Sequence, residues 1–218
     1  MDNKQKLTKE LIIDTVFKLA DQEGIESVSM RHIALKLNVK AMSLYNHVKN
    51  KEEVIELMAD KLIGLVDYEI TVDWQTSMIN RARQLKELLL EHSWALIPLL
   101  TGFHTGMNII SDFDRSIGIL RKGGFSYANC NQITSMIDSY VYGYVLSSVS
   151  FPIEEDDFQS TADTYKDVFP KETFPHMWGL SHEIRIGNYS GIIDFELGLN
   201  VVISGIENTI EIKGENKK

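Results

Sequence analysis

Five side chains in the first quarter of the chain have the chemistry needed to contact a nucleic acid. Arg31, Lys40 and Lys51 carry positive charges that could neutralise backbone phosphates. Ser43 and Asn46 could hydrogen-bond to the edges of bases. Side chains of these types also occur on ordinary solvated surfaces, so their meaning depends on the elements that position them.

The distribution of charge favours the same part of the chain. The protein has 218 residues and a net charge of −9, with 44% hydrophobic and 24% charged residues, as in an ordinary globular protein. Residues 1–66 hold ten cations and ten anions, whereas residues 67–218 hold twelve cations and twenty-one anions. An acidic C-terminal part would repel DNA everywhere except at the neutral N-terminal part.

The sequence contains none of the motifs that we would expect of a catalytic or metal-binding site. The sequence has no glycine-rich phosphate loop, no His-Glu-x-x-His pair and no nucleophile elbow. His176 and His182 lack the i, i+4 spacing of a helical metal site. Cys130 is the only cysteine, which excludes an intrachain disulfide. We therefore expect no metal, no cofactor and no enzyme activity, while a redox role for Cys130 stays open.

The N-terminal residues form a pattern of four helices. Thr8 is typical of a cap that begins a first helix, and Gly24 of the residue that ends it. Ser29 begins a short second helix, a turn at Asn38 follows, and a third helix begins near Lys40. Asn50 and Glu53 would begin a fourth helix with a capping box. The positions of this helix expected to face inward are Val54, Leu57, Met58, Lys61, Leu62 and Leu65.

Residues 33–48 have the apolar spacing of a helix-turn-helix. Ala34 is small where two helices would cross closely, Val39 fills the turn, and Leu44 and Val48 anchor the second helix. The turn holds Asn38 where glycine is usual, and asparagine tolerates a positive φ. The same spacing occurs in helical hairpins that never touch DNA, so the pattern alone leaves both interpretations open.

The segment from Ser29 to Glu53, and above all its piece Tyr45-Asn46-His47-Val48-Lys49-Asn50-Lys51, resembles the N-terminal signature of the TetR family of transcriptional regulators. The resemblance covers about residues 8–66 and implies a three-helix DNA-binding domain with its third helix in the major groove. It assigns to the recognition-helix surface the residues Lys40, Ala41, Met42, Ser43, Tyr45 and Asn46. It also implies phosphate contacts by His47 and Lys51, and a groove or backbone contact by Arg31.

The rest of the chain is expected to be helical as well. Helices are predicted from Asp73 to about Leu90, over about 106–122, 126–150 and 192–212, and a short segment over 95–100 is expected to be broken by Pro98. Pieces such as 120–126, 142–146 and 195–200 resemble the tetracycline-repressor subgroup. This resemblance implies a homodimer formed by the helices near 126–150 and 192–212.

Large, adaptable side chains suggest where a small molecule could bind in the C-terminal part. The candidate ligand contacts are Trp94, Phe103, His104, Met107, Met136, Tyr140 and Tyr144. Few of them carry charge, so we expect a mostly apolar effector. The acidic balance of residues 67–218 favours a neutral or cationic effector over an anion. Burial in an ordinary core is the simpler explanation for any single one of them. In the tetracycline repressor, which this part resembles, a histidine of the matching helix helps to hold the magnesium-bound drug. Residues 135–144 have no histidine, which argues against a tetracycline–magnesium ligand.

The sequence as a whole predicts an all-α protein with three parts. Residues 1–50 are expected to form the helix-turn-helix DNA-binding domain, residues 51–66 a connecting helix, and residues 67–218 the larger ligand-sensing and dimerisation domain. We expect a cytoplasmic repressor without a membrane segment, which a small molecule releases from a palindromic double-stranded DNA operator. A DNA-binding regulator without an effector, or a helical enzyme, is the alternative.

Overall fold

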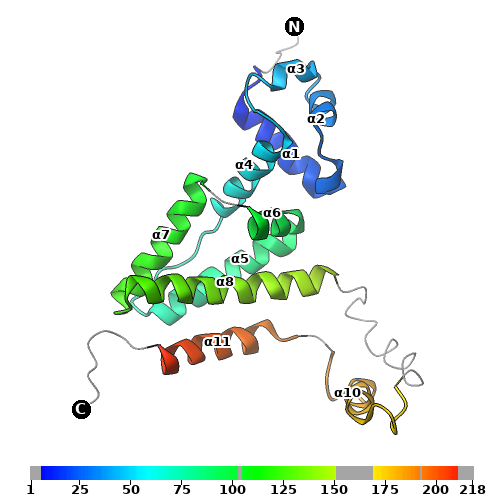
Figure 1. The fold of residues 1–218 in the computed structure, drawn as a ribbon, viewed down its shortest axis with the longest axis vertical. Helices are drawn as coiled ribbons and strands as arrows, with labels where there is room; N and C mark the ends of the chain where they lie inside the picture. Colours follow the sequence, from blue (N-terminus) through cyan, green and yellow to red (C-terminus); the bar gives the residue numbers. More distant parts are fainter. Residues whose placement is uncertain (1–5, 103–104, 151–168, 192, 211–218) are drawn as a thin grey trace.

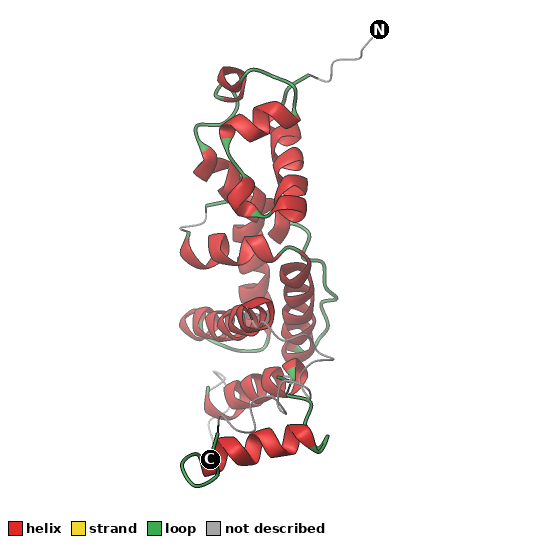
Figure 2. Cartoon of the chain, turned by 90° about the vertical axis from the view of Figure 1, so that its right-hand side faces the viewer, coloured by secondary structure: helices red, strands yellow, loops and turns green. Residues whose placement is uncertain are grey.

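The computed structural model describes residues 6–102, 105–150, 169–191 and 193–210. Over these residues the chain is all-α, as predicted, and Figure 2 shows helices joined by loops without a strand. The head comprises α1 (Lys9–Glu23), the 3-10 turn η1 (Ile25–Ser27), α2 (Met30–Lys36), α3 (Ala41–Leu44) and α4 (Lys51–Ile63). The body comprises α5 (Trp74–Glu91), η2 (Ser93–Ala95), α6 (Leu96–Thr101), α7 (Met107–Lys122), α8 (Tyr127–Ser150), α10 (Pro175–Arg185) and α11 (Phe195–Thr209).

Polar side chains begin the helices of the head where the sequence predicts. Thr8 Oγ1 accepts a hydrogen bond from the N–H of Leu11 at 3.1 Å, and Ser29 Oγ accepts one from His32 at 3.2 Å. These bonds satisfy N–H groups that have no partner inside the first turn. α1 ends at Gly24, whose φ of +79° lies in the region that favours glycine.

Helix α4 connects the two parts of the molecule, running from the head at the top of Figure 1 toward the body. Val54, Met58 and Leu62 are fully buried along it, as predicted. The prediction was wrong for two other inward positions. Leu65 follows the end of the helix and is 47% exposed, and the Lys61 ammonium forms an ion pair with Asp14 of α1. Lys61 therefore places its charge at the surface between α4 and α1 rather than in the core.

Helices α5, α7 and α8 pack on one another and hold the core of the body, with α11 against α8 (Figure 1). Met78, Leu120 and Ile137 are fully buried there, and Trp74 packs edge-on against Phe125 at 5.1 Å. The predicted break at Pro98 does not occur, because Pro98 lies in the first turn of α6, where a missing N–H costs no helical bond.

A buried ion cluster ties the three central helices of the body together. Arg81 of α5 is 3% exposed and donates from Nε and Nη2 to Asp112 of α7 at 3.0 and 2.7 Å. Its Nη1 donates to Asp138 of α8 at 2.5 Å. Burial alone would lower the pKa of Arg81, but the charges of Asp138 and Asp112 outweigh burial and raise it. Arg81 is therefore held in its charged form.

Helix α10 has no counterpart among the predicted helices. It lies at the lower right of Figure 1, apart from α5, α7 and α8, and none of its side chains is buried. Pro175 occupies its first turn, and Trp178 stacks on His182 with ring centroids 5.0 Å apart. None of the helices in the described ranges combines the length and apolar character of a bilayer span.

Candidate nucleic-acid interface

Helices α2 and α3 form the predicted helix-turn-helix. Asn38 in the turn has a φ of +52°, the only positive value at a described residue other than glycine. The N–H of Val39 then donates to the carbonyl of Ala34 at 3.0 Å and closes the turn. Ala34 is 5% exposed and Leu44 is fully buried, so the two helices share one apolar contact. This packing fixes the direction in which the outer face of α3 points.

Helix α3 is shorter than expected for a recognition helix. Its regular part ends at Leu44, and the next residues continue as hydrogen-bonded turns. The N–H groups of His47 and Val48 both donate to the Leu44 carbonyl, at 2.9 and 3.0 Å. Tyr45, Asn46 and His47 therefore lie on an extension of the helix rather than on regular helical turns.

The predicted DNA-facing residues lie mostly on the surface of the head. Met42 is 74% exposed and Tyr45 is 48% exposed, although both are large and partly apolar. Arg31, Lys40 and Asn46 are exposed. The four that are only partly exposed are Ala41, Ser43, His47 and Lys51.

Ion pairing divides the cations of the head into two groups. Lys9, Lys36 and Lys61 are paired with Glu53, Glu23 and Asp14, respectively. By contrast, Arg31, Lys40 and Lys51 form no ion pair within the described residues. A cation without a protein partner has its charge available for a phosphate.

One apolar side chain on this surface was not predicted. Leu35 of α2 is 75% exposed and, with Arg31 and Ala41, lines a shallow hollow of about 440 Å³ between α2 and α3. The sequence pattern does not predict the exposure of Leu35, because this residue is next to the buried Ala34 and resembles an ordinary apolar residue of the core. Its exposure suits an apolar contact with a base or sugar.

The candidate ligand residue Trp94 lies between head and body. Its Nε1 donates to Oδ1 of Asp21 in α1 at 2.7 Å, and Phe17 packs edge-on against its ring at 5.1 Å. His92 Nδ1 also lies 2.7 Å from Oδ1 of Asp21. Trp94 therefore fixes the head to the body.

The other candidate ligand residues are spread over the body. Met107 is 72% exposed and lines a hollow of about 580 Å³ between the beginnings of α4 and α7. Tyr140 donates to the carbonyl of Phe195 at 2.9 Å, and Tyr144 packs against the Phe195 ring at 4.9 Å. Two of the candidate ligand residues, Phe103 and His104, lie outside the described ranges. Met136, Trp94 and Met107 line three different hollows, and the contact of the described candidates with a ligand stays a prediction.

Two family models match this chain over most of its length. Residues 12–58 match the model of bacterial regulatory proteins of the tetR family, and residues 70–210 match the model of the tetracyclin repressor-like C-terminal domain. The chain belongs to the TetR family. The resemblance in the sequence is thereby confirmed for the helix-turn-helix part and for the C-terminal part.

Relatives within the TetR family support the same conclusion. A helix-turn-helix transcriptional regulator of Saccharopolyspora erythraea is 31% identical over 65% of this chain, and the match spans 61% of that relative. The class D tetracycline repressor of Escherichia coli is 25% identical over 93% of this chain and 90% of the repressor. Among solved structures, Streptomyces coelicolor ActR in complex with actinorhodin aligns with a TM-score of 0.81 and 25% identity, over 94% of this chain and 98% of ActR.

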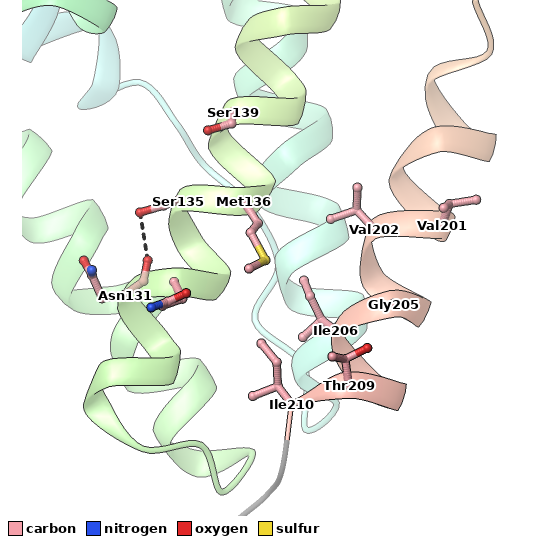
Figure 3. A pocket seen from close by; sticks show the side chains of 11 residues that line it. Asn131, Ser135, Met136, Ser139, Val201, Val202, Gly205, Ile206, Thr209 and Ile210 are labelled. Atoms are coloured by element: carbon pink, nitrogen blue, oxygen red, sulfur yellow. Dashed lines mark hydrogen bonds between the residues drawn. The ribbon is translucent and has the colours of Figure 1, made fainter.

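An apolar groove lies between α8 and α11 on the body of this TetR-family chain. It encloses about 720 Å³, and Met136 of α8 faces Val202 and Ile206 of α11 and Ile210 just after that helix (Figure 3). Around it, Leu197 and Val201 are 63% and 64% exposed. Single exposed apolar residues are common, but a contiguous apolar groove usually marks an interaction surface.

Proposed function

We propose that this protein is a sequence-specific DNA-binding repressor that a small molecule releases from a palindromic operator. The observation that carries the proposal is the surface of α2 and α3, where Arg31, Lys40, Tyr45 and Asn46 are exposed and the two cations form no ion pair within the described residues. The cations would contact phosphates, and Asn46 and Ser43 would contact base edges. His47, Lys51, Ala41 and Met42 would complete the contact surface.

The operator-binding form is proposed to be a homodimer. Leu197 and Val201 are exposed on one chain, and the groove between α8 and α11 offers apolar side chains on both walls. A second copy with α8 and α11 packed against the same helices would cover this surface through a two-fold axis. Such a dimer reads two half-sites whose centres are about one helical turn of DNA apart, or a multiple of it.

A small molecule is proposed to control DNA binding through the body. The complex of ActR with actinorhodin supports this, since ActR is similar to this chain over nearly its full length. The two heads of the dimer must be at the spacing of the half-sites to bind the operator. A ligand that binds more tightly to a conformation with another spacing must therefore lower operator affinity, by reciprocal linkage. We propose no catalytic role. A regulator of this kind would act in the cytoplasm, where the operator is.

The experiment that tests the function is selection of DNA by the purified protein. From a random duplex pool, we expect enrichment of a palindrome with two similar half-sites, bound by wild type at nanomolar to tens of nanomolar concentration. The double variant Arg31→Ala/Lys40→Ala should keep the fold because both side chains are exposed and neither forms an ion pair within the described residues, and it should recover no motif. Recovery of unrelated sequences by wild type would overturn the proposal.

A further inference from the structure

The head and the body enclose a cleft that shares only Lys51 with the proposed DNA surface. It has a volume of about 720 Å³ and lies between the end of α1 with η1, the first turns of α4, and η2 with α6. We call it the head–body cleft. Sites for drug-sized ligands have volumes of about 300–1,000 Å³, so the cleft is large enough for one.

The walls of the head–body cleft are mainly apolar. Ile55 of α4 belongs to the head, and Trp94, Ile97 and Pro98 belong to the body. Ile97 is 56% exposed, and Val149 at the end of α8 is 45% exposed. Apolar side chains from both parts therefore face one hollow, and a ligand there would bury surface on the head and on the body together.

The charges at the head–body cleft are mainly negative. Asp21, Glu26 and Glu91 line it, and Lys51 is the cation among its lining residues. Both hydrogen bonds to Asp21, from His92 and Trp94, fall on Oδ1. Within the described residues, Oδ2 of Asp21 receives no hydrogen bond. A positively charged group in the cleft would therefore meet an excess of carboxylates beside an apolar wall.

From this combination we infer that the head–body cleft binds a lipophilic organic cation, and that occupation of the cleft changes the position of the head. The aromatic and aliphatic wall recognises the apolar part of the ligand, and the carboxylates of Glu26 and Glu91 recognise its charge. Only the effect on operator binding rests on the proposed function, because binding itself requires no DNA.

The test uses tetraphenylphosphonium as the cation and tetraphenylborate as an anion of the same shape. Isothermal titration calorimetry should detect one tetraphenylphosphonium per wild-type chain and no tetraphenylborate. Glu26→Gln/Glu91→Gln should raise the Kd for the cation about tenfold, since two attractive charges are lost. The control variant Glu10→Gln/Glu172→Gln removes the same charge from exposed sites outside the cleft and should leave the Kd within about twofold.

A steric variant tests the position independently of charge. Thr101 lines the cleft and is exposed, so Thr101→Trp would fill the cleft without disturbing the core and should abolish binding of the cation. Failure of the cation to bind wild type, equal binding of the anion, or unchanged binding by Glu26→Gln/Glu91→Gln or by Thr101→Trp would each overturn the site.

The effect on DNA is measured separately, with the selected operator. Tetraphenylphosphonium should weaken operator binding by wild type and leave the affinity of Thr101→Trp unchanged. If the cation binds the cleft but operator affinity stays constant, the proposed movement of the head is wrong while the site stands. If the protein selects no operator at all, the proposed function fails, and the calorimetric result is unaffected.

Discussion

Asp60 of α4 and Asn108 of α7 join the head to the body through two hydrogen bonds. The backbone N–H of Asn108 donates to Oδ1 of Asp60 and its side-chain amide to Oδ2, each at 3.0 Å. The N–H of Ile109 also donates to Oδ1, at 3.0 Å. Since Gly106 offers α7 no side-chain cap, a carboxylate from α4 satisfies the first N–H groups of α7. The connecting helix thus serves as the N-terminal cap of a body helix.

Asp60→Ala should lower the free energy of unfolding by about 1–2 kcal/mol, because the first turn of α7 loses its cap. Asp60→Asn keeps an oxygen for the backbone N–H groups and should lose less. Urea denaturation at a fixed chain concentration measures both. Glu56→Ala, on the same helix but without a hydrogen bond to α7 within the described residues, is the control. Equal losses in Asp60→Ala and Glu56→Ala would contradict the capping role.

Two lysines of the head should differ in their effect on DNA binding. Lys40 is exposed and has no ion pair in the part of the chain that the structure describes, whereas Lys36 is paired with Glu23 at 2.8 Å. Lys40→Ala should weaken operator binding and reduce the slope of log K against log salt by about one, through loss of one phosphate contact. Lys36→Ala should change neither by much. Fluorescence anisotropy over a series of salt concentrations checks this, and equal slopes for the two variants would count against the assignment.

Uncharged residues of the same surface should behave differently. Tyr45→Ala should weaken operator binding and leave the salt slope almost unchanged, since no charge is removed. Because Tyr45 is 48% exposed, the fold should tolerate the change, and circular dichroism should detect the same helical content. Unchanged operator affinity in Tyr45→Ala would show that the side chain does not face DNA.

The local features of the fold were predictable because they depend on neighbouring residues. Thr8, Ser29 and Asn50 each cap a helix through a bond to a residue three positions on, so type and spacing suffice to find them. Asn38 was found in the same way, since few residues accept a positive φ.

The contacts between head and body could not be predicted in this way. Asp21 and Trp94 are 73 positions apart, and Asp60 and Asn108 are 48 positions apart. Nothing in the local pattern of either partner indicates the other, so the sequence predicts Trp94 as a ligand contact or a core residue and not as a partner of Asp21. Helix α10 also went unpredicted, in a segment whose sequence is interrupted by Pro170 and Pro175, and none of its side chains is buried.

Dimerisation should depend on the exposed side of α11. Val201→Glu places a charge on a residue that is 64% exposed in one chain, so a single chain should still fold. If a second copy covers this surface, an unpaired charge costs several kcal/mol there and should shift the protein to monomers. Gln22→Glu adds the same charge on the exposed side of α1 and should stay dimeric. A stable Val201→Glu dimer in sedimentation would place the interface elsewhere.

Cys130 should react slowly with thiol reagents. Its side chain is buried in α8, and burial raises the pKa of the thiol, with Arg121 acting in the opposite direction. A raised pKa leaves less thiolate at neutral pH, and the thiolate is the reactive form. Labelling by Ellman's reagent should therefore be slow in the native protein and fast in urea. Rapid labelling without urea would instead support redox sensing.

The Arg81 cluster should be the most sensitive point of the body. Arg81→Met leaves Asp112 and Asp138 without their shared cation, and breaking a buried pair typically costs about 3–5 kcal/mol. The control is Arg83→Met on the same helix, where an exposed pair with Glu196 should contribute about 1 kcal/mol or less. Urea denaturation compares the two variants.

A third variant separates the loss of the guanidinium from the charges left behind. If uncompensated carboxylates cause the instability, Asp112→Leu and Asp138→Leu added to Arg81→Met should restore much of the lost stability, because no buried charge then remains. If packing of the Arg81 stem is the cause instead, the triple variant should be no more stable than Arg81→Met. Equal effects of Arg81→Met and Arg83→Met would contradict a special role for the buried cluster. Recovery in the triple variant would identify charge balance as the requirement that joins α5, α7 and α8.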